Sequence, residues 1–457
     1  MAQKPPEGRL NMPKRIVIIG ANAAGTDAAS AARKTDRKAE IVLLTREDKG
    51  AYSRCGLPFV LDGHISRFED LIVYPPSFYK MMKLDLRLQT TATKINTDER
   101  TVDIQSKEGK SEALEYDSLI IATGSKPFTP PIEGIDKEGV FTLHTFEDGV
   151  KLLKAMKKAK TAVVIGSGLV GLETAVAFTR MNIKTTVIEM LPYILPRMLD
   201  KDMAIEVQKR LEDKGIRILL GKPAEAIIGN KRARAVAVGG EEIPADIVLN
   251  AAGVRPNTDL AREAGIEIGE TRGIKTNIRM RTSAEDVYAA GDCAETTHIV
   301  TGRPCLPLLG ATAVREGKVA GVNAAGGYTI FPGALCSAVS QLLDFEVGST
   351  GLTEFTAKKV GVEVIIGRIS GLTRAAYYPG AKPIKVKLLI EKEEKRVVGA
   401  QIVGGEEVTQ RINALSLAIQ KRVTVYELIK ADTCYAPSVC ETWEPIVLAA
   451  EMALRRF

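Results

Sequence analysis

The sequence predicts an α/β protein in which one β-α-β domain is inserted into another, followed by a separate α+β domain. Three observations predict this architecture. Glycine-rich turns follow β-branched strands twice, over residues 16–25 and 161–171. From about Phe331 the pattern changes to antiparallel strands followed by helices. A chain of 457 residues is also too long for one ordinary core, so two to three domains are expected.

The first unit begins with the strand Ile16–Ile19, a turn at Gly20 and an alanine-rich helix over Thr26–Lys34, and the strand Ile41–Leu44 completes it. The turn reads G-x-N-x-x-G, with Asn22 at the usual middle glycine. Asn is the non-glycine residue that most readily adopts a positive φ, so the turn is expected to survive. Backbone N–H groups at such a helix start can bind a pyrophosphate. The candidate contacts are Gly20, Asn22, Ala23, Ala24 and Gly25.

The acid that usually follows the second strand of such a unit, where it binds a ribose, is missing from the first unit. The strand leads instead to Thr45, and Glu47 follows two residues later. Either the hydroxyl of Thr45 or the carboxylate of Glu47 can take this role, and the sequence leaves both open.

The second unit contains strand, turn, helix, strand and acid in the expected order. The strand Thr161–Ile165 precedes the turn Gly166–Gly171, and a helix continues through Met181. The strand Lys184–Ile188 then ends at Glu189, 23 residues after Gly166. A carboxylate there binds a ribose 2′-hydroxyl and repels a 2′-phosphate, so NADH is predicted over NADPH. The candidate contacts are Gly166, Gly168, Leu169, Val170, Gly171 and Glu189.

Three later turns fit the same nested plan. The strand in Tyr116–Ser125 ends in Ala-Thr-Gly, where the chain is expected to cross between the two domains. Residues 250–257, with Gly253, close the inner domain, and the segment Asp286–Asp292 ends in Gly-Asp. Together they add Thr123, Gly124, Gly253, Gly291 and Asp292 as candidates.

Cys55 is the candidate reactive residue, since it lies between the two units in the segment Tyr-Ser-Arg-Cys-Gly-Leu-Pro. We expect it near a helix N-terminus, a position that lowers a thiol pKa and supplies a thiolate. The plainer interpretation is an inert buried cysteine, the usual fate of a lone Cys. A thiol between two dinucleotide sites favours electron transfer to sulfur.

These motifs resemble the pyridine nucleotide–disulfide oxidoreductases over nearly the whole chain. Within that family the sequence is similar to the single-cysteine branch of coenzyme A disulfide reductases, NAD(P)H persulfide reductases and NADH oxidases. The resemblance implies a glutathione-reductase-like fold, with two nested Rossmann-like nucleotide-binding domains plus a C-terminal α+β dimerisation domain. The expected ranges are 1–148 and 273–328 for FAD binding, 149–272 for NAD binding and 331–457 for dimerisation.

The resemblance also implies FAD and NADH as cofactors, with Asp292 on the ribityl chain of FAD and Arg54 among the cofactor contacts. Glutathione-reductase relatives have a second cysteine five positions after the first, and Val60 stands there, which excludes an internal redox disulfide at this site. Glu173, near the start of its helix, resembles a family residue beside the nicotinamide, although a helix-start acid could equally be structural.

Two tyrosine segments point to the coenzyme A disulfide reductase side of the branch. Ala376–Ala381 contains Tyr-Tyr-Pro-Gly, and Cys434–Pro437 contains Tyr-Ala-Pro. By resemblance, Tyr378 (or Tyr377) and Tyr435 reach the active cysteine of a partner subunit in a homodimer. NADH oxidases and peroxidases of the family carry a histidine where Ala23 stands, so efficient reduction of oxygen or peroxide is not expected.

The sequence therefore predicts an FAD-dependent NADH oxidoreductase that reduces a disulfide, persulfide or polysulfide, with a coenzyme A-linked small molecule as the expected acceptor. The alternatives are an NADH oxidase or peroxidase, and a diaphorase subunit that passes electrons to an iron–sulfur protein. A disulfide between Cys55 and Cys434 or Cys440 across the dimer is a further hypothesis, with ordinary interface cysteines as the plainer one. Cys293, Cys305 and Cys336 are expected to be structural.

Composition excludes several other classes. Aromatic residues make up only 5% of the chain, which argues against base-stacking surfaces for nucleic acid. Six scattered cysteines and three histidines lack metal-site spacing, so no metal is expected. Met1–Lys14 lacks the apolar segment of a signal peptide, and no apolar run is long enough for a bilayer. A cytoplasmic protein with reduced thiols is predicted.

Overall fold

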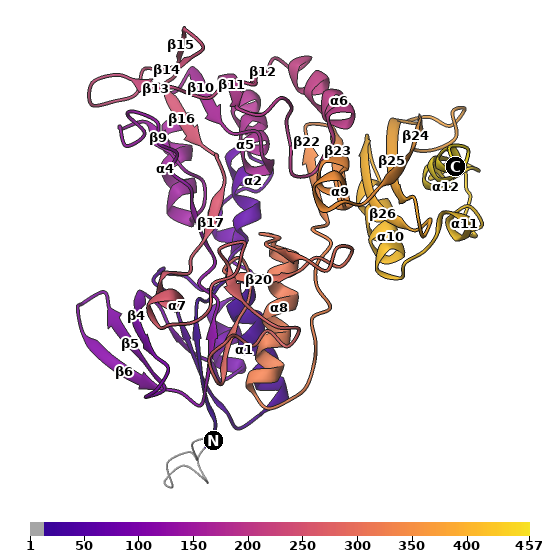
Figure 1. Cartoon of the computed structure of the whole chain (residues 1–457). Helices are drawn as coiled ribbons and strands as arrows, with labels where there is room; N and C mark the ends of the chain where they lie inside the picture. The colour runs from indigo at the N-terminus through magenta and orange to yellow at the C-terminus, as the bar shows by residue number, and fades with distance from the viewer. Residues whose placement is uncertain (1–12) are drawn as a thin grey trace.

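The computed structural model describes residues 13–457. Residues 1–12, which include the start of the first expected domain and most of the polar N-terminal stretch, lie outside the described residues. Within 13–457, no helix combines the length and apolarity needed to cross a bilayer. The chain forms three bodies, which we call the outer, inserted and C-terminal domains (Figure 1).

The outer domain is built on a parallel sheet of order β19-β7-β1-β2-β3. Its last strand, β19, returns from far along the sequence, as the nested plan predicts. Helices α1 and α8 lie against each other beside the sheet, because Gly317 and Gly321 carry no Cβ. A Cβ there would lie 2.2 and 2.1 Å from the carbonyl oxygens of Ala24 and Ala28. The elements are β1 (Arg15–Ile19), α1 (Ala23–Thr35), β2 (Glu40–Leu44), β3 (Asp85–Arg87), β7 (Ser118–Ile121), β19 (Val287–Ala289) and α8 (Gly310–Ala324).

Short elements that the sequence did not predict complete the outer domain. An antiparallel sheet of β4, β5 and β6 projects from its side in Figure 1. Further short elements surround Cys55 and the returning segment. They are η2 (Arg54–Gly56), α2 (Leu57–Leu61), η3 (Phe68–Leu71), α3 (Pro76–Met81), β4 (Thr90–Asn96), β5 (Thr101–Ser106), β6 (Ser111–Glu115), α7 (Asp259–Glu263), β18 (Ile274–Lys275), β20 (Ala294–Thr297) and β21 (Pro304–Cys305).

The inserted domain repeats the plan with a parallel sheet of order β12-β11-β10-β16-β9. The chain enters and leaves it through β8 and β17, which pair antiparallel at the junction of the two domains. The elements are β8 (Ser125–Pro127), β9 (Val140–Phe141), α4 (Phe146–Met156), β10 (Thr161–Ile165), α5 (Leu169–Arg180), β11 (Lys184–Glu189), α6 (Lys201–Glu212), β12 (Arg217–Leu220), β13 (Ala226–Ile228), β14 (Ala235–Val238), β15 (Glu241–Pro244), β16 (Ile247–Asn250) and β17 (Val254–Pro256).

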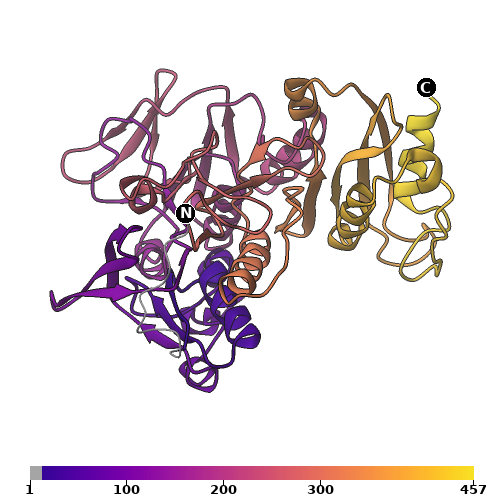
Figure 2. The same cartoon turned by 60° about the horizontal axis from the view of Figure 1, so that its bottom comes forward.

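The C-terminal domain is an antiparallel sheet of order β22-β23-β26-β25-β24, covered by helices. It lies to one side of the two nested domains in both views (Figures 1 and 2). The predicted strands and helices are present, and β23 was not predicted. The elements are β22 (Ala338–Leu342), β23 (Phe345–Gly351), α9 (Glu354–Val360), β24 (Val364–Leu372), β25 (Pro383–Glu391), β26 (Val397–Gly404), α10 (Val408–Gln420), α11 (Val425–Leu428) and α12 (Pro445–Leu454).

A buried lysine joins the C-terminal domain to the inserted domain. Lys387 of β25 is fully buried, and its Nζ lies 3.0 Å from Asp200 Oδ2 and 2.7 Å from Asp202 Oδ1, while Glu354 forms a third ion pair. These three carboxylates are close enough together to hold a metal ion. The ammonium of Lys387 already supplies the compensating positive charge, so the cluster is an ion-pair network that fixes one domain on the other.

Candidate active site

Cys55 lies on η2, immediately before the five-residue helix α2, so the structure places it near a helix N-terminus as expected. The turn is tight because Gly56 lies against Leu71, whose Cδ2 would be 2.4 Å from a Cβ at that position. The residue is exposed, whereas Val60 on the next turn is buried. Cys55 is therefore accessible, with no cysteine five positions later to pair with.

The expected lowering of the Cys55 pKa is wrong for the chain without bound cofactors. Protein packed around the thiol on its inner sides desolvates it and raises its pKa, and the charges of Glu173 and Asp292 raise it further. A hydrogen bond from backbone opposes this only in part. The position of the thiol was predictable from its motif, but the two carboxylates come from distant segments. The pKa of Cys55 thus depends on the charges of Glu173 and Asp292.

Glu173 lies in the second turn of α5, not in the first as the sequence suggested. Burial raises its pKa to about 7, and a hydrogen bond from Ser340 Oγ to Glu173 Oε1 at 2.6 Å partly opposes this rise. Ser340 belongs to β22, so the C-terminal domain of the same chain contacts the site. This acid therefore exchanges a proton near neutral pH, the range in which a catalytic carboxyl is useful.

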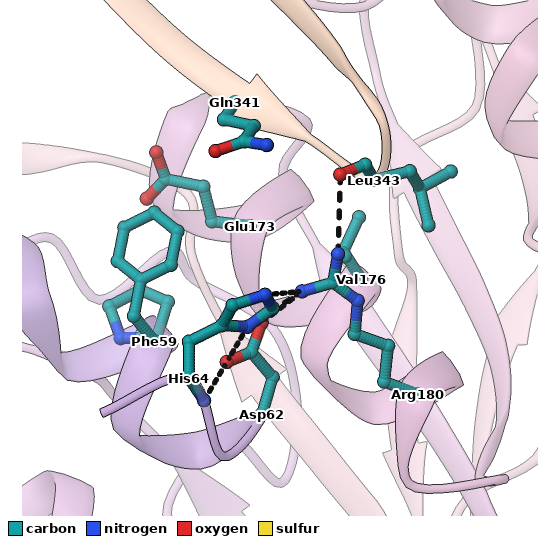
Figure 3. Close-up of a pocket in the computed structure, with 9 residues that line it drawn as sticks. Phe59, Asp62, His64, Glu173, Val176, Arg180, Gln341 and Leu343 are labelled. Carbon is teal, nitrogen blue, oxygen red and sulfur yellow. Dashed lines mark hydrogen bonds and ion pairs between the residues drawn. The ribbon is translucent and has the colours of Figure 1, made fainter. Parts of the chain in front are cut away.

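A small cavity of about 40 Å³ borders Glu173 where the three domains meet (Figure 3). Arg180 of α5 closes one side: its Nη1 donates to Asp62 Oδ2 at 2.6 Å, and its Nη2 donates to the carbonyl of Leu343 at 3.2 Å. Asp62 also holds the ring of His64 at 2.8 Å. These bonds fix α2, α5 and the turn after β22 around the carboxyl.

Asp292 is held by a polar network that the sequence did not reveal. Ser125 Oγ donates to Asp292 Oδ2 at 2.8 Å, and the carbonyl of Ser125 lies 2.9 Å from His144 Nε2. The carbonyl of His144 accepts from Arg54 at 3.1 Å. Burial, followed by the charge of Arg54, lowers the pKa of His144 to about 4, so the ring is neutral at pH 7. The network ties Arg54, beside Cys55, to Asp292.

Glu316 of α8 was also missed. Its Oε2 accepts from the backbone N–H of Gly291 at 2.8 Å, which fixes the turn that carries Asp292. Burial, with the nearby charge of Asp292, raises the pKa of Glu316 to about 8. Its Oε1 is buried, and no partner for it exists within residues 13–457. The only sign of this residue in the sequence is a glutamate in an alanine-rich helix. That pattern is too common to predict a site residue.

The first glycine-rich turn has the expected backbone but one expectation is wrong. Asn22 has φ −101° and is the extended N-cap of α1, whereas the positive φ of the turn belongs to Gly20 (φ +113°). Gly25 is required because a Cβ there would lie 1.7 Å from the carbonyl oxygen of Gly20. Nδ2 of Asn22 is buried and finds no partner in the part of the chain that the structure describes. This orphaned donor, at a helix start with no acid in its first turn, fits an anionic ligand.

The second turn repeats this geometry. Gly166 has φ +104°, and a Cβ on Gly171 would lie 2.3 Å from the carbonyl oxygen of Gly166. A Cβ on Gly168, the N-cap of α5, would instead meet no atom within 4 Å. The absence of a side chain there leaves open space before the helix N-terminus, where Leu169 and Val170 begin the helix. This cradle fits a dinucleotide pyrophosphate.

Glu189 ends β11 beside this cradle, as predicted. Its Oε2 accepts from the N–H of Ser167 at 2.9 Å and from the Ser167 hydroxyl at 2.6 Å, and its Oε1 accepts from the N–H of Leu191 at 2.9 Å. The carboxylate therefore orders the turn as well as presenting negative charge. These backbone bonds require an acceptor at position 189.

The structure places both candidates for the missing ribose acid near the first turn. Thr45 follows β2 directly, and its hydroxyl accepts from the N–H of Glu47 at 3.2 Å. Both carboxylate oxygens of Glu47 are engaged by protein, one by Tyr52 at 2.6 Å and one by Arg54 at 2.5 Å. Glu47 therefore positions Arg54 next to Cys55. Of Thr45 and Glu47, Thr45 thus has fewer of its side-chain hydrogen bonds taken up by protein.

The turns at Thr123–Gly124 and Gly253 meet at the crossing between the domains. Thr123 Oγ1 donates to the carbonyl of Asn257 at 2.6 Å, and the N–H of Asn257 donates to the carbonyl of Gly124 at 2.8 Å. The N–H of Phe128 donates to the carbonyl of Gly253 at 2.9 Å. The Ala-Thr-Gly turn therefore lies where the sequence placed it.

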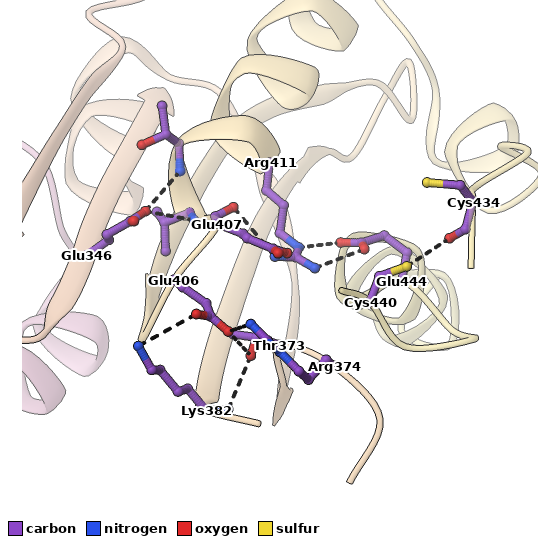
Figure 4. A network of polar contacts seen from close by, with 12 residues as sticks. Glu346, Thr373, Arg374, Lys382, Glu406, Glu407, Arg411, Cys434, Cys440 and Glu444 are labelled. Atoms are coloured by element: carbon purple, nitrogen blue, oxygen red, sulfur yellow. Dashed lines mark hydrogen bonds and ion pairs between the residues drawn. The ribbon is translucent and has the colours of Figure 1, made fainter. Parts of the chain in front are cut away.

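Tyr377 and Tyr435 lie together, with their hydroxyls 2.9 Å apart, and Tyr378 is partly exposed beside them. Salt bridges hold both loops on the C-terminal sheet (Figure 4): Glu406 pairs with Arg374 and Lys382 at the ends of the first loop. Arg411 of α10 pairs with Glu444 at the end of the second, 2.6 Å apart. Helices α11 and α12, which flank the second loop, lie on the opposite side of the C-terminal sheet from α2 in Figure 1. The tyrosines are thus not brought to the Cys55 of their own chain.

Cys434 and Cys440 differ in their surroundings. Cys440 is buried, and its thiol donates to the carbonyl of Cys434 at 3.4 Å and accepts from the N–H of Ala436 at 3.2 Å. Cys434 is exposed. If either reaches a partner subunit, the structure favours Cys434, because Cys440 orders its own loop.

Residues 14–317 match the pyridine nucleotide-disulphide oxidoreductase family, and residues 338–446 match the dimerisation domain of the same family. An NADH oxidase of Methanocaldococcus jannaschii is 44% identical over 445 residues, which cover 97% of this chain and 99% of that protein. A CoA-dependent NAD(P)H sulfur oxidoreductase of Pyrococcus abyssi is 37% identical, covering 96% and 98%. The structure of an NAD-dependent persulfide reductase from A. fulgidus has a TM-score of 0.94 at 38% identity, covering 97% and 83%.

These matches span both nucleotide-binding domains and the C-terminal domain, in the order in which the sequence predicted them. They confirm the resemblance drawn from the two glycine-rich turns, the Gly-Asp segment and Cys55. The chain belongs to the pyridine nucleotide-disulphide oxidoreductases, flavoprotein enzymes that bind FAD and use NAD(P)H.

Proposed function

We propose that the protein is an NADH oxidoreductase that reduces a low-molecular-weight disulfide, persulfide or polysulfide of the coenzyme A type through Cys55. One observation carries the proposal: the exposed thiol of Cys55 lies near the charges of Glu173 from the inserted domain and Asp292 from the outer domain, which raise its pKa. Val60 stands where a second redox cysteine would be. The relatives named as a CoA-dependent sulfur oxidoreductase and a persulfide reductase support the acceptor class.

We assign FAD to the outer domain and NADH to the inserted domain, as defined above by their sheets. The first turn, with the orphaned Nδ2 of Asn22, would hold the FAD pyrophosphate, and Asp292 would hold its ribityl chain. The second turn and Glu189 would hold NADH. FAD held there would supply the redox chemistry that links NADH to the sulfur acceptor.

The residues of the chain then control the charge on Cys55. Its thiolate attacks a sulfur atom of the acceptor, and this needs a lower thiol pKa than that of the bare chain. Glu173 has a pKa of about 7, so near neutral pH it becomes neutral when it takes up one proton. Neutral Glu173 removes one of the two negative charges that raise the Cys55 pKa. Proton uptake at Glu173 thereby favours the thiolate.

We further propose a homodimer formed through residues 331–457, in which Tyr377 or Tyr378 and Tyr435 reach the partner's active cysteine. Large apolar side chains are exposed around these loops, where a partner subunit would cover them: Tyr377, Tyr378, Tyr435, Val439 and Trp443. The match to the family's dimerisation domain supports the same interface.

Oxygen is the second candidate acceptor, because the M. jannaschii relative is named an NADH oxidase. Ala23 at the start of α1 offers no proton donor of the kind that a histidine would supply there. A diaphorase would need the two nucleotide sites and no thiol at position 55. The two alternatives therefore differ from the proposal in what each requires of Cys55 and the acceptor.

The test is NADH consumption by the Cys55→Ser variant, with coenzyme A disulfide, coenzyme A persulfide, polysulfide and oxygen as separate acceptors. We expect turnover with the sulfur acceptors to disappear, while bleaching of the flavin by NADH in the absence of oxygen is kept. Cys305→Ser is the matched control, because it removes a partly exposed free thiol that has no role in the proposed reaction. Full sulfur turnover by Cys55→Ser, or turnover with oxygen alone in the parent enzyme, would overturn the proposal.

A further inference from the structure

The carboxyl of Glu316 on α8 lies where three parts of the outer domain meet, and the residue is 1% exposed. Its Oε2 accepts from the N–H of Gly291 at 2.8 Å, in the turn that follows β19 and carries Asp292. The next residue of α8, Gly317, packs on the start of α1, because a Cβ there would lie 2.2 Å from the carbonyl oxygen of Ala24. One carboxyl is therefore buried between α8, the Asp292 turn and the start of α1.

The backbone of the Asp292 turn packs closely around this bond. Gly291 is buried and has φ +81°, and a Cβ there would lie 2.9 Å from Ala24 Cβ and 3.4 Å from Ala313 Cβ. The turn therefore lies directly against both α1 and α8. Removal of the acceptor on Glu316 would leave the N–H of Gly291 buried and unpaired.

The bonding of the carboxyl favours its neutral form. Oε1 of Glu316 is buried and has no hydrogen-bond partner within residues 13–457. Because Oε2 bonds a backbone N–H, neither oxygen is bonded by a cation in the part of the chain that the structure describes. A carboxylate buried without a paired cation is strongly unfavourable, and the protonated acid is far less so.

The charged and titratable groups near Glu316 support the same conclusion. Asp292 adds a like charge, and the thiol of Cys305 in β21 also lies near. Arg315, the neighbouring residue on α8, is exposed, and its Nε donates to the carbonyl of Ala311 at 3.0 Å. Burial raises the pKa of Glu316 to about 8, against the opposing bond from Gly291 and with the charge of Asp292. The carboxyl therefore loses its proton under mildly alkaline conditions.

We propose that Glu316 is a positioning residue of the FAD site: its protonated carboxyl holds the Asp292 turn, and loss of that proton weakens FAD binding. The proposal rests on the assignment of FAD to the outer domain made under the proposed function. An ionised Glu316 would place a second negative charge beside Asp292, and FAD is itself an anion. Ionisation therefore opposes both the position of the turn and the charge of the cofactor.

FAD binding and protonation of Glu316 are linked. Because bound FAD adds negative charge to the site, it should raise the pKa of Glu316 further. By reciprocity, ionised Glu316 lowers the affinity for FAD by the same factor. Full affinity is present at low pH and is lost as the pH rises from about 8, where the free chain loses this proton, to the higher pKa of the FAD-bound chain. A pKa that rises by about 1 on binding corresponds to about a tenfold loss of affinity.

The test is the dissociation constant of FAD at pH 7.0 and pH 9.5. The flavin-bound protein is diluted serially into buffers of equal ionic strength, and released FAD is measured by its fluorescence. Glu316→Gln keeps an acceptor for Gly291 and cannot ionise, and Glu99→Gln changes an exposed glutamate of the outer domain as the matched control. We expect the constant to rise about tenfold more in the parent and in Glu99→Gln than in Glu316→Gln. Effects of pH on FAD itself are common to all three proteins.

Circular dichroism of the same samples shows whether the chain stays folded. An equal rise in the parent and in Glu316→Gln would overturn the proposal. Release of FAD that accompanies loss of the circular dichroism signal would also overturn it, because the whole fold and not the turn would then respond to pH. If Glu316→Gln fails to fold, the parent decides alone: its affinity must fall over a single proton at or above about pH 8, and a flat profile refutes the idea. The measurement uses neither NADH nor a sulfur acceptor, so its failure leaves the proposed reaction at Cys55 untouched.

Discussion

Replacing Glu173 with glutamine should make the folded protein more stable at alkaline pH and change its stability little at acid pH. The carboxyl has a pKa of about 7 in the folded chain, against an ordinary value of 4.5. Folding therefore favours its protonated form. The stability associated with that proton is fully present below pH 4.5 and is lost as the pH rises to about 7. Glutamine keeps the shape and can still accept from Ser340, but it never ionises.

The magnitude follows from the shift. A change from 4.5 to about 7 corresponds to at most about 3.5 kcal/mol of differential stability, at about 1.4 kcal/mol for each pH unit. Between pH 5 and pH 8 we expect the stability of Glu173→Gln relative to the parent to rise by about 2 to 3 kcal/mol. Other ionisable groups titrate equally in both proteins, so the difference isolates this carboxyl.

The assay is urea unfolding of the flavin-bound protein at both pH values, followed by circular dichroism and by flavin fluorescence. Glu99→Gln is the matched control, because Glu99 is an exposed glutamate on the outer domain. A second readout is the rate at which iodoacetamide alkylates Cys55, which should rise at a given pH when the charge of Glu173 is removed. A stability difference that is the same at both pH values would refute the reasoning, whatever its size.

Three other predictions concern the cofactor, the interdomain contact and the partner subunit. Glu189→Gln should reduce the preference for NADH over NADPH by about tenfold or more, because it removes the charge that repels a 2′-phosphate. Glutamine keeps an acceptor for Ser167. The preference is measured as the ratio of the kcat/KM values for the two nucleotides. An unchanged ratio would contradict this role. Lys387→Met should cost about 3 to 5 kcal/mol in urea unfolding, since Asp200, Asp202 and Glu354 lose their shared cation, whereas the exposed Lys358→Met should cost almost nothing. Tyr435→Phe should lower sulfur turnover by about two to three orders of magnitude without loosening the flavin, and an active monomer in sedimentation analysis would defeat the shared site.

The nested fold could be predicted because the residues that define each nucleotide-binding unit lie close together in the sequence. Strand, glycine turn and helix follow one another within about ten residues, and the glycines are needed by backbone contacts inside the same unit, as Gly25 against Gly20 shows. The sheet of β4 to β6 was missed because its strands are short, half-exposed and charged. Its hydrophobic pattern is too weak to separate strands from loops.

The candidate site could be predicted only in part, for a related reason. Cys55, Glu189 and Asp292 follow motif spacing, and the structure places all three where the motifs do. Ser340, His144 and Glu316 act on them from other domains or other helices, and no local pattern marks such contacts. The pKa of Cys55 is raised first by burial and then by the charges of Glu173 and Asp292, which come from distant segments of the chain. A motif that implied a helix N-terminus therefore implied the wrong direction.

The Ser340–Glu173 contact gives the C-terminal domain a role within its own chain, besides the proposed role of its tyrosines in the partner. Ser340 lowers the pKa of Glu173 through one hydrogen bond, and Glu173 in turn raises the pKa of Cys55. The position of β22 relative to α5 is fixed in part by Lys387, which joins the same two domains. Loss of the Ser340 bond alone, as in Ser340→Ala, would raise the pKa of Glu173, whereas hydration of the carboxyl by a movement of the C-terminal domain would lower it, because burial is the largest cause of its raised pKa. The charge state of the reactive sulfur is thus coupled to how the C-terminal domain sits on the inserted domain, and not to the outer domain alone.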